Sequence, residues 1–400
     1  MIYRIFFRLF LQRIDAEVAH AIASRVLRTA TAIPGLGAAI RRVLAARDPR
    51  LDVGALGRRF PSPLGVAAGV DKDASWFESL GDIGFGYVEV GTVTALSQEG
   101  NPRPRVHRFV PERALLNQMG FPNPGAKVVA KRLRRRTGRT IVGVNVGKSR
   151  LVPVKDAGDD YRASVRELAP SADYIVINVS SPNTPGLREM QAVDLLLPLV
   201  RDVQSELEAG AARVPVLVKI GADLGDDQLD AVADLCLTLG LDGIVAVNTT
   251  VDRSGSAAFR DRAASIEGGG VSGAPLKARA LHVLRHLYGR VGNDLVLISV
   301  GGIETPDDAW QRILAGATLV QAYTGFTYGG PAWPRRINRA LARRVRDGGR
   351  ASIQDFVGAE ANAPCRTERT NGTGPGSRLH RTGVRAPRGG DSRPPGRPRP

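Results

Sequence analysis

The sequence predicts an α/β protein built on a (β/α)8 TIM barrel, with a helical arm before the barrel and a disordered tail after it. Eight apolar runs of strand length recur between residues 64 and 323, and segments long enough for a helix separate most of them. An alternation of strands and helices implies a parallel sheet, and eight repeats in about this length of chain imply that the sheet closes. We therefore divide the chain into residues 1–47, 48–348 and 349–400.

The composition narrows the class of protein further. The 400 residues are 43% hydrophobic, enough for one large core. Two cysteines rule out a disulfide framework and a cysteine-rich metal site, and Cys236 falls on the apolar side of a helical pattern, as a core residue would. The five histidines show no metal-ligand spacing, so we expect no metal.

The formal charge of +17 would suit a partner such as nucleic acid or an anionic membrane. Much of this charge, however, lies in peripheral segments: the arm, the run Arg132-Leu133-Arg134-Arg135-Arg136, the pairs Arg335-Arg336 and Arg343-Arg344, and the tail. We interpret it as solvated helix faces and a basic tail, and we expect no nucleic-acid partner.

The arm, residues 1–47, is helical in pattern. Ile2, Ile5, Phe6, Leu9 and Phe10 fall at helical spacing, a second apolar stripe covers about 16–27, and 34–35 (Pro-Gly) predicts a turn. The first stretch is too short and too charged to span a bilayer or to act as a signal peptide. An amphipathic helix of this kind either lies in a membrane interface or packs on its own domain, and the pattern leaves both open.

Each barrel element has its own signal. Residues 226–239, 276–288 and 305–315 have helical patterns, the last with Thr305 as N-cap and Pro306 at the first helical position. Residues 51–53 and 58–60 predict a hairpin that closes the barrel floor, and 104–111 a hairpin-like insertion after the second strand. The predicted barrel strands are 64–68, 87–90, 141–146, 174–179, 214–220, 243–248, 295–300 and 319–323.

The tail, residues 349–400, changes in composition. Apolar residues become sparse, and Gly, Pro, Arg, Ser and Thr dominate. Such a segment buries too little surface to offset the entropy of ordering, so we predict disorder.

The residues expected to do chemistry follow the strands, because barrel enzymes build their sites at the carboxyl ends of the strands. Lysines, amides, hydroxyls and glycines converge there, with Asp71 as the one acid among them. Amides suit a flat ligand with alternating donors and acceptors, and the glycines after strands seven and eight suit a phosphate. We expect a phosphate-bearing planar cofactor and a small polar planar substrate.

Several motifs resemble one family. They are residues 67–73 (AAGVDKD), 91–94 (GTVT), 117–121 (NQMGF), 178–186 (NVSSPNTPG), 248–250 (NTT) and 300–303 (VGGI). Together they resemble dihydroorotate dehydrogenase, in order from the first helix to about residue 345. The arm, and a serine rather than a cysteine at position 181, are similar to class 2, the membrane-associated, quinone-reducing branch.

The resemblance implies a function in pyrimidine biosynthesis. Dihydroorotate would be oxidised to orotate, with FMN, one per chain, receiving the hydride and a membrane quinone receiving the electrons. Ser181 would be the base, with Thr184 and Phe121 shaping a proton relay. The protein would be a monomer, peripheral on the cytoplasmic side of the cell inner membrane.

The resemblance also assigns binding residues. Lys72 would pair with the substrate carboxylate, and Lys219 would lie beside the flavin, where positive charge favours the reduced ring. The other substrate residues implied are Asn117, Gln118, Met119, Gly120, Phe121, Asn178, Asn183, Asn248 and Thr249. The flavin residues implied are Ala68, Gly69, Val70, Asp71, Lys72, Thr92, Asn145, Asn178, Lys219, Val247, Gly273, Gly302, Tyr323 and Thr324. The quinone would meet the arm with His20, and also Arg108 and Tyr323.

Three alternatives stay open. A soluble class 1 enzyme would use fumarate or NAD, but Ser181 and the arm argue against it. An FMN barrel acting on RNA, similar to a dihydrouridine synthase, would suit the charge but not the NVSSPNTPG loop. A basic binding module without catalysis would require a lost catalytic group, yet Lys72, Ser181 and Lys219 are all present.

Overall fold

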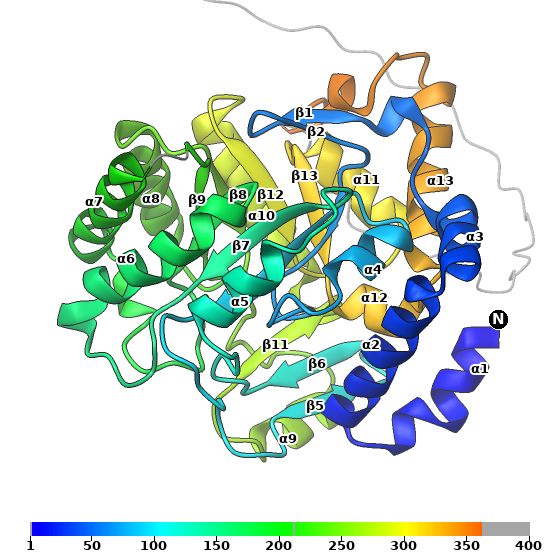
Figure 1. Cartoon of the computed structure of the whole chain (residues 1–400), viewed down its shortest axis with the longest axis horizontal. Coiled ribbons are helices and arrows are strands. Elements are labelled where there is room, and N and C mark those ends of the chain that lie inside the picture. Colours follow the sequence, from blue (N-terminus) through cyan, green and yellow to red (C-terminus); the bar gives the residue numbers. More distant parts are fainter. Residues whose placement is uncertain (1, 211–212, 362–400) are drawn as a thin grey trace, which may run out of the picture. The chain divides into compact units, whose positions relative to one another are not determined.

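The computed structural model describes residues 2–210 and 213–361. Eight parallel strands close into a barrel in which β13 pairs with β3, and all eight predicted strands are confirmed (Figure 1). Their ends differ from the prediction by up to three residues. The strands are β3 (Leu64–Val66), β4 (Tyr87–Val93), β7 (Ile141–Val146), β8 (Tyr174–Asn178), β9 (Val216–Ile220), β10 (Gly243–Ala246), β12 (Val296–Val300) and β13 (Leu319–Ala322).

Helices pack around the outside of this barrel. The predicted N-cap is confirmed, because the Thr305 hydroxyl accepts the Asp308 N–H at 3.2 Å and the Asp308 carboxylate accepts the Thr305 N–H at 2.8 Å. Cys236 is fully buried, as predicted. These helices are α4 (Phe77–Asp82), α5 (Ala126–Leu133), α6 (Ala157–Leu168), α7 (Val193–Ala209), α8 (Asp226–Thr238), α10 (Lys277–Val291), α11 (Pro306–Leu314), α12 (Thr324–Gly329) and α13 (Trp333–Asp347). A further helix, α9 (Ala257–Ala264), packs in a separate cluster with Phe109, Leu116 and Val271.

A hairpin of β1 (Val53–Ala55) and β2 (Arg58–Phe60) closes the floor of the barrel. Phe60 is fully buried and meets the first residue of β4, Tyr87, edge to face with ring centroids 5.2 Å apart. The predicted first strand, 51–53, was wrong in position. Residues Pro49–Leu51 form the 3-10 turn η2 instead, because the Asp48 side chain caps it.

A second, three-stranded sheet stands at the other end of the barrel. It contains β5 (Val106–Phe109), β6 (Ala114–Asn117) and β11 (Gly270–Gly273), in the order β11-β6-β5. β5 and β6 form the hairpin-like insertion that the sequence predicts at residues 104–111. The predicted range contains β5 but ends before β6, which begins at Ala114. The third strand comes from the distant segment that follows β10.

The arm forms α1 (Ile2–Leu9), α2 (Ala16–Ala32) and α3 (Pro34–Leu44). The turn predicted at 34–35 was wrong: Pro34 is the first residue of α3, where its fixed φ suits a helix start, and the chain bends at Ile33. Asp15 caps α2 by accepting the N–H groups of Glu17 and Val18 at 2.9 and 3.0 Å.

Polar contacts hold the arm against the barrel. Both carboxylate oxygens of Glu17 accept hydrogen bonds from the buried guanidinium of Arg105, at 2.9–3.2 Å. Arg108 donates to the carbonyls of Ile14 and Asp15 at 2.7 and 3.3 Å, and Tyr3 donates to the carbonyl of Thr327 at 2.7 Å. The arm therefore packs on its own domain, and it also keeps an exposed apolar side.

Residues 349–361, which the sequence assigned to the tail, fold against the barrel. They include η7 (Ile353–Phe356), whose Ile353 and Phe356 are buried, and Gln354 exchanges two hydrogen bonds with the backbone of Gly54. The ordered region therefore extends past the predicted boundary at 348. The rest of the predicted tail, 362–400, lies outside the described residues.

Candidate active site

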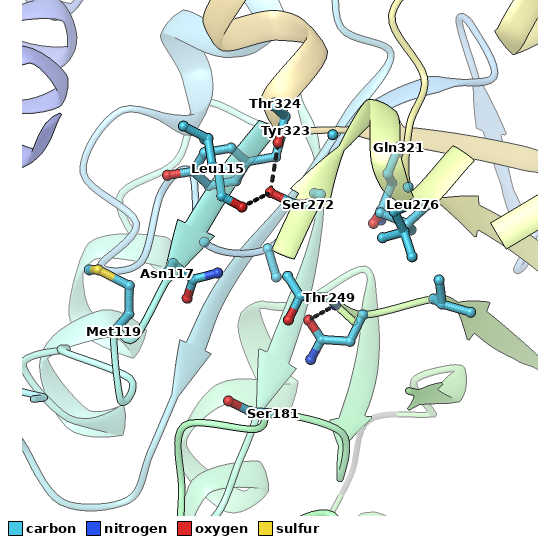
Figure 2. Close-up of a pocket in the computed structure, with 18 of the residues that line it drawn as sticks. Leu115, Asn117, Met119, Ser181, Thr249, Ser272, Leu276, Gln321, Tyr323 and Thr324 are labelled. Carbon is cyan, nitrogen blue, oxygen red and sulfur yellow. Dashed lines mark hydrogen bonds between the residues drawn. The ribbon is translucent and has the colours of Figure 1, made fainter. Parts of the chain in front are cut away.

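A cavity opens at the carboxyl ends of the barrel strands, between the barrel rim and the three-stranded sheet. Figure 2 shows Ser181 at one end of it and Tyr323 and Thr324 at the other. The sequence-predicted residues that line it are Ala68, Gly69, Lys72, Thr92, Asn117, Met119, Gly120, Phe121, Asn178, Ser181, Asn183, Lys219, Val247, Asn248, Thr249, Gly273, Gly302, Tyr323 and Thr324.

The loop after β8 presents Ser181 to this cavity. Ser181 is 5% exposed, and its hydroxyl oxygen accepts the backbone N–H of Asn183 at 3.2 Å. Among the described residues, the hydroxyl hydrogen of Ser181 has no acceptor. The side-chain oxygen of Thr184, buried nearby in the same loop, has no hydrogen-bond partner among the described residues.

A chain of amides and hydroxyls runs beneath the loop. The Asn178 amide donates to Thr92 Oγ1 at 2.9 Å and to Asn145 Oδ1 at 3.1 Å, and the Thr92 hydroxyl donates to Asn145 Oδ1 at 2.6 Å. The Ser180 hydroxyl donates to the side-chain oxygen of Asn178 at 2.9 Å and accepts from the Asn248 side-chain amide at 3.1 Å. The orientations of these amides are therefore fixed before any ligand binds.

Glu89 lies at the base of this chain, and sequence reasoning missed it. Its fully buried carboxylate accepts from the amides of Asn145 at 2.8 Å and Gln321 at 2.7 Å, and Lys219 Nζ lies 3.5 Å away. A buried carboxylate needs such partners, because an unpaired one would lose its hydration without compensation. Its one sequence signal was an acid inside an otherwise apolar strand.

Lys72 brings a second positive charge to the cavity. Its ammonium donates to the Gly69 carbonyl at 2.6 Å. Burial lowers the pKa of Lys72 to about 8, while the nearby carboxylate of Glu17 opposes the shift. The lysine is therefore mostly protonated at neutral pH and able to hold an anionic group.

Three further amide side chains face the space around Ser181. The Asn183 amide donates to the Asn117 backbone and side-chain oxygens at 3.1 and 3.2 Å, which ties the serine loop to β6. The Asn248 side-chain oxygen accepts the Thr249 N–H at 2.9 Å. The arrangement offers donors and acceptors in several directions, as a planar heterocycle with ring N–H and C=O groups requires.

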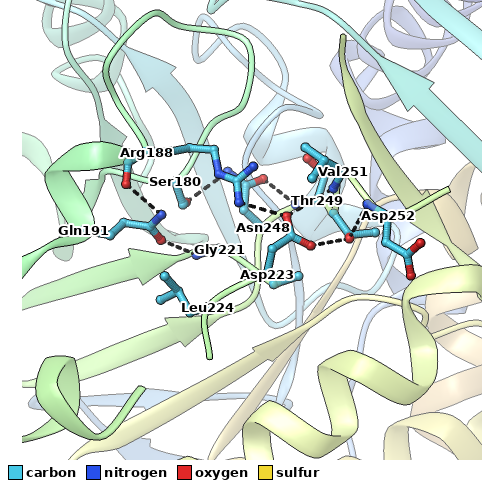
Figure 3. Close-up of polar contacts among 12 residues, drawn as sticks. Ser180, Arg188, Gln191, Gly221, Asp223, Leu224, Asn248, Thr249, Val251 and Asp252 are labelled. Atoms are coloured by element: carbon cyan, nitrogen blue, oxygen red, sulfur yellow. Dashed lines mark hydrogen bonds and ion pairs between the residues drawn. The ribbon is translucent and has the colours of Figure 1, made fainter. Parts of the chain in front are cut away.

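A polar brace outside the cavity supports these loops (Figure 3). Arg188, in the segment that follows the serine loop, pairs with Asp223 at 3.0 Å, and Asp223 also accepts from Thr250 and from the Val251 N–H. Gln191 accepts the Gly221 N–H at 2.6 Å. The loops after β8, β9 and β10 are therefore bound to one another.

Glycines open the far end of the cavity. Gly302 has φ +72°, and a Cβ there would lie 2.5 Å from the Lys277 backbone. Within the described part of the chain, the N–H groups of Gly302 and Thr324 have no acceptor. The amide oxygen of Gln321, buried in the cavity, also has no partner among those residues. Free N–H groups suit a phosphate, and a lone acceptor suits a ring N–H.

Several predicted residues do not line the cavity. Asn145 lies behind it and orients its neighbours, and Val70 is buried below. Asp71 accepts the N–H groups of Ser75 and Trp76, and burial raises the pKa of Asp71 to about 7. Gln118 donates to the carbonyl of Glu267 outside the cavity.

Of the predicted quinone residues, only Tyr323 reaches the cavity. Arg108 donates to the backbone of the arm, so it lies where the arm meets the barrel, and its quinone role stays a prediction. The His20 ring packs edge to face on Trp76, with centroids 5.5 Å apart, and burial lowers the pKa of His20 to about 4, so the ring is neutral at pH 7.

Sequence reasoning also missed cavity residues that are apolar or lie on β11. Leu115 and Val106 come from β6 and β5, and Ser272 on β11 shares a 2.8 Å hydrogen bond with Thr324. The other missed residues are the polar Gln321 on β13 and the apolar Ala67, Leu276, Val300, Ile303 and Ala322, whose types carry no chemical signal along the chain. Gly301 and Gly325, which also line the cavity, belong to the glycines expected after strands seven and eight.

A family model described as dihydroorotate dehydrogenase matches residues 50–345. Curated relatives agree. A protein of Thermobifida fusca named dihydroorotate dehydrogenase (quinone) is 54% identical over 367 residues, covering 90% of this chain and 97% of its own length. A protein of Rhodococcus opacus with the same name is 53% identical, covering 90% and 99%.

Solved structures are similar as well. Ligand-free DHODH from Eimeria tenella has a TM-score of 0.78 at 35% identity, over 86% of this chain and 99% of that one. The complex of Eimeria tenella DHODH with ferulenol has a TM-score of 0.76 at 36% identity, over 87% and 96%. Because the curated relatives are named for a quinone acceptor, the soluble class 1 alternative, which would use fumarate or NAD, is not favoured. The chain therefore belongs to the dihydroorotate dehydrogenase family, in its quinone-dependent class 2 branch.

Proposed function

We propose that this protein oxidises dihydroorotate to orotate in pyrimidine biosynthesis, with FMN as its cofactor and a membrane quinone as the electron acceptor. The observation that carries the proposal is the arrangement of the cavity. A buried serine, whose hydroxyl hydrogen has no acceptor in the part of the chain that the structure describes, faces the same space as two lysines and a set of fixed amides.

The residues divide the work by chemistry. The Lys72 ammonium holds the substrate carboxylate, and Asn117, Asn183 and Asn248 hold the pyrimidine ring. Ser181 Oγ takes the proton from C5. A serine hydroxyl is a weak base, so it must release its own hydrogen as the C5 proton arrives. The proposed acceptor of that hydrogen is the Thr184 hydroxyl, which is buried and has no partner among the described residues.

The other end of the cavity fits FMN. The N–H groups of Gly302 and Thr324 would hold its phosphate, the Gln321 amide oxygen would accept a ring N–H, and the Lys219 ammonium would lie beside the ring. When bound, FMN accepts the hydride from C6 and passes electrons to the quinone. Glycine at position 302 keeps the backbone accessible, since any side chain there would meet Lys277.

The arm is proposed to bring the enzyme to the quinone, peripherally on the cytoplasmic side of the inner membrane. No helix among the described residues is long and apolar enough to cross a bilayer. The arm instead carries exposed apolar side chains: Ile5, Phe6 and Leu9 on α1, Phe10 directly after it, and Val18, Ile22 and Val26 on α2. Apolar residues in such number on a surface helix suit the membrane interface.

An anaerobic titration tests the proposal. The purified protein should show a flavin spectrum that dihydroorotate bleaches and that a quinone, but not fumarate, restores. A flavin that dihydroorotate leaves oxidised would refute the substrate. Recovery with fumarate would refute the acceptor, and a protein unable to take up FMN would refute the cofactor.

A further inference from the structure

A groove on the surface between α3 and α13 carries an excess of arginines that the oxidation of dihydroorotate does not use. The two helices lie beside each other, on the side of the barrel that the arm covers (Figure 1). Six arginines line the groove against a single acid, Asp48. The arginines are Arg42, Arg47, Arg335, Arg339, Arg343 and Arg346.

Their spacing makes the groove a continuous basic surface. Residues 335, 339, 343 and 346 follow one another at helical intervals of four, four and three, so they share one face of α13. The opposite face is apolar and buried, with Ile337, Leu341 and Val345 fully enclosed. The arginine face is therefore fixed toward solvent.

Most of this charge is not neutralised. Within residues 2–210 and 213–361, Arg42, Arg335, Arg339 and Arg343 form no ion pair with a carboxylate. The lining acid Asp48 is already engaged, because Arg50 binds both of its carboxylate oxygens, at 2.9 and 3.2 Å. Like charges gathered this closely repel one another, and an anion in the groove relieves that repulsion.

The groove is continuous with exposed apolar surface. Val43 lines the groove and is 53% exposed, and it lies one heptad from Leu36, 46% exposed, on the same face of α3. Ile33, at the bend before α3, is 50% exposed and extends this row toward α2. Apolar side chains bordered by arginines match the boundary between acyl chains and anionic headgroups.

We propose that the groove between α3 and α13 binds the headgroups of acidic phospholipids. The inference rests on the proposed membrane contact of the arm and adds a lipid class to it. Guanidinium groups bind phosphate through paired hydrogen bonds, so a phosphodiester headgroup is the anion that these side chains suit best. The charged groove would orient the enzyme while the apolar arm enters the interface.

The test compares the full-length holoenzyme with two variants on two kinds of vesicle, phosphatidylcholine alone and phosphatidylcholine mixed with phosphatidylglycerol. The groove variant carries Arg339→Gln and Arg343→Gln. The matched control removes the same charge at the end of α5, with Arg134→Gln and Arg135→Gln, which are also exposed. The basic segment beyond residue 361 is common to all three proteins, so it does not affect the comparison.

The groove variant should bind the anionic vesicles roughly 30-fold more weakly than the parent, since each basic side chain near such a surface contributes about fivefold. Binding to neutral vesicles, and flavin reduction by dihydroorotate, should stay unchanged. Equal losses of vesicle binding in both variants, or no preference of the parent for anionic vesicles, would refute lipid binding by the groove but not the membrane contact of the arm. A parent that binds neither kind of vesicle would refute both the groove binding and the arm contact. The proposed reaction is tested separately by the flavin titration.

Discussion

The carboxylate of Glu89 lies 3.5 Å from the ammonium of Lys219, and both side chains are almost completely removed from solvent. The two residues come from β4 and β9, on different sides of the barrel. The pair places a compensated charge directly beneath the cavity. Lys219 can therefore remain in a dry site, where an isolated ammonium would be costly.

Glu89→Gln should lower the free energy of unfolding by roughly 3–5 kcal/mol, because it leaves a buried lysine without its counter-charge. Urea unfolding of the two proteins measures the difference. Asp52→Asn is the control: Arg59, its partner in an exposed ion pair, is 76% exposed, and the loss should stay below about 1 kcal/mol. Similar losses in the two variants would contradict the role assigned to Glu89.

Ser181→Ala should slow flavin reduction by dihydroorotate roughly 10²- to 10⁴-fold while FMN stays bound, because the proton acceptor is lost. Anaerobic stopped-flow bleaching measures the rate. Ser180→Ala, one residue away, removes a hydroxyl that orients Asn178 and Asn248, and it should cost roughly five- to tenfold. An unchanged rate in Ser181→Ala would show that another group accepts the proton.

Thr184→Val should slow flavin reduction without lowering the free energy of unfolding. The Thr184 hydroxyl is buried without a partner among the described residues, so its removal should leave the free energy of unfolding unchanged or raise it by about 1 kcal/mol. Flavin reduction should nevertheless slow by roughly tenfold or more, since the proton outlet is gone. Thr184→Ser keeps the hydroxyl and should retain the rate. A valine variant as fast as the parent would rule out the outlet.

The pH dependence of kcat/KM should report Lys72. Its pKa is lowered to about 8 by burial, so the ammonium loses its proton, and its hold on the substrate carboxylate, as the pH rises through that value. We expect kcat/KM for dihydroorotate to fall above about pH 8. Lys72→Arg keeps its charge at these pH values, and its profile should stay flat there. The same fall in the arginine variant would assign the titration to another group.

Phe6→Ser with Phe10→Ser should weaken binding to neutral vesicles by roughly tenfold or more, because each ring loses its apolar contact with the bilayer. The ring centroids of Phe6 and Phe10 lie 5.4 Å apart, and the two residues are 46% and 60% exposed. The substitutions therefore remove little buried surface, and the melting temperature should not change. Leu151→Ser, at a position 86% exposed outside the arm, is the control and should bind normally. Equal binding by all three proteins would contradict the membrane role of the arm.

Local patterns predicted the barrel because the strands are largely apolar runs and segments of helix length separate most of them. The alternation of strand and helix signals then left few topologies. The same reasoning placed Ser181 and Lys219 on one rim, since parallel strands end together. The helix start at Thr305 was readable because its cap is formed by residues only three positions apart.

What the sequence could not predict depends on distant segments. β11 joins β6 across more than 150 residues of chain, and neither strand has a strong pattern of its own. Glu89 and Gln321 become a pair only when the barrel closes. The fold of 353–356 was hidden because its two apolar residues, Ile353 and Phe356, lie in a stretch that is otherwise polar.

The hydrogen bond from Tyr3 to Thr327 joins positions 324 residues apart. The pairing of β3 with β13 likewise joins an early segment of the chain to a late one. A ribosome releases the arm first and its barrel acceptor near the end of synthesis. The nascent chain therefore carries α1 undocked for most of translation, with its barrel-facing and its exposed apolar sides both uncovered, whereas Trp76 and Arg105, which hold α2, emerge much earlier. The emergence of residue 327 is the step that first allows α1 to take its final position.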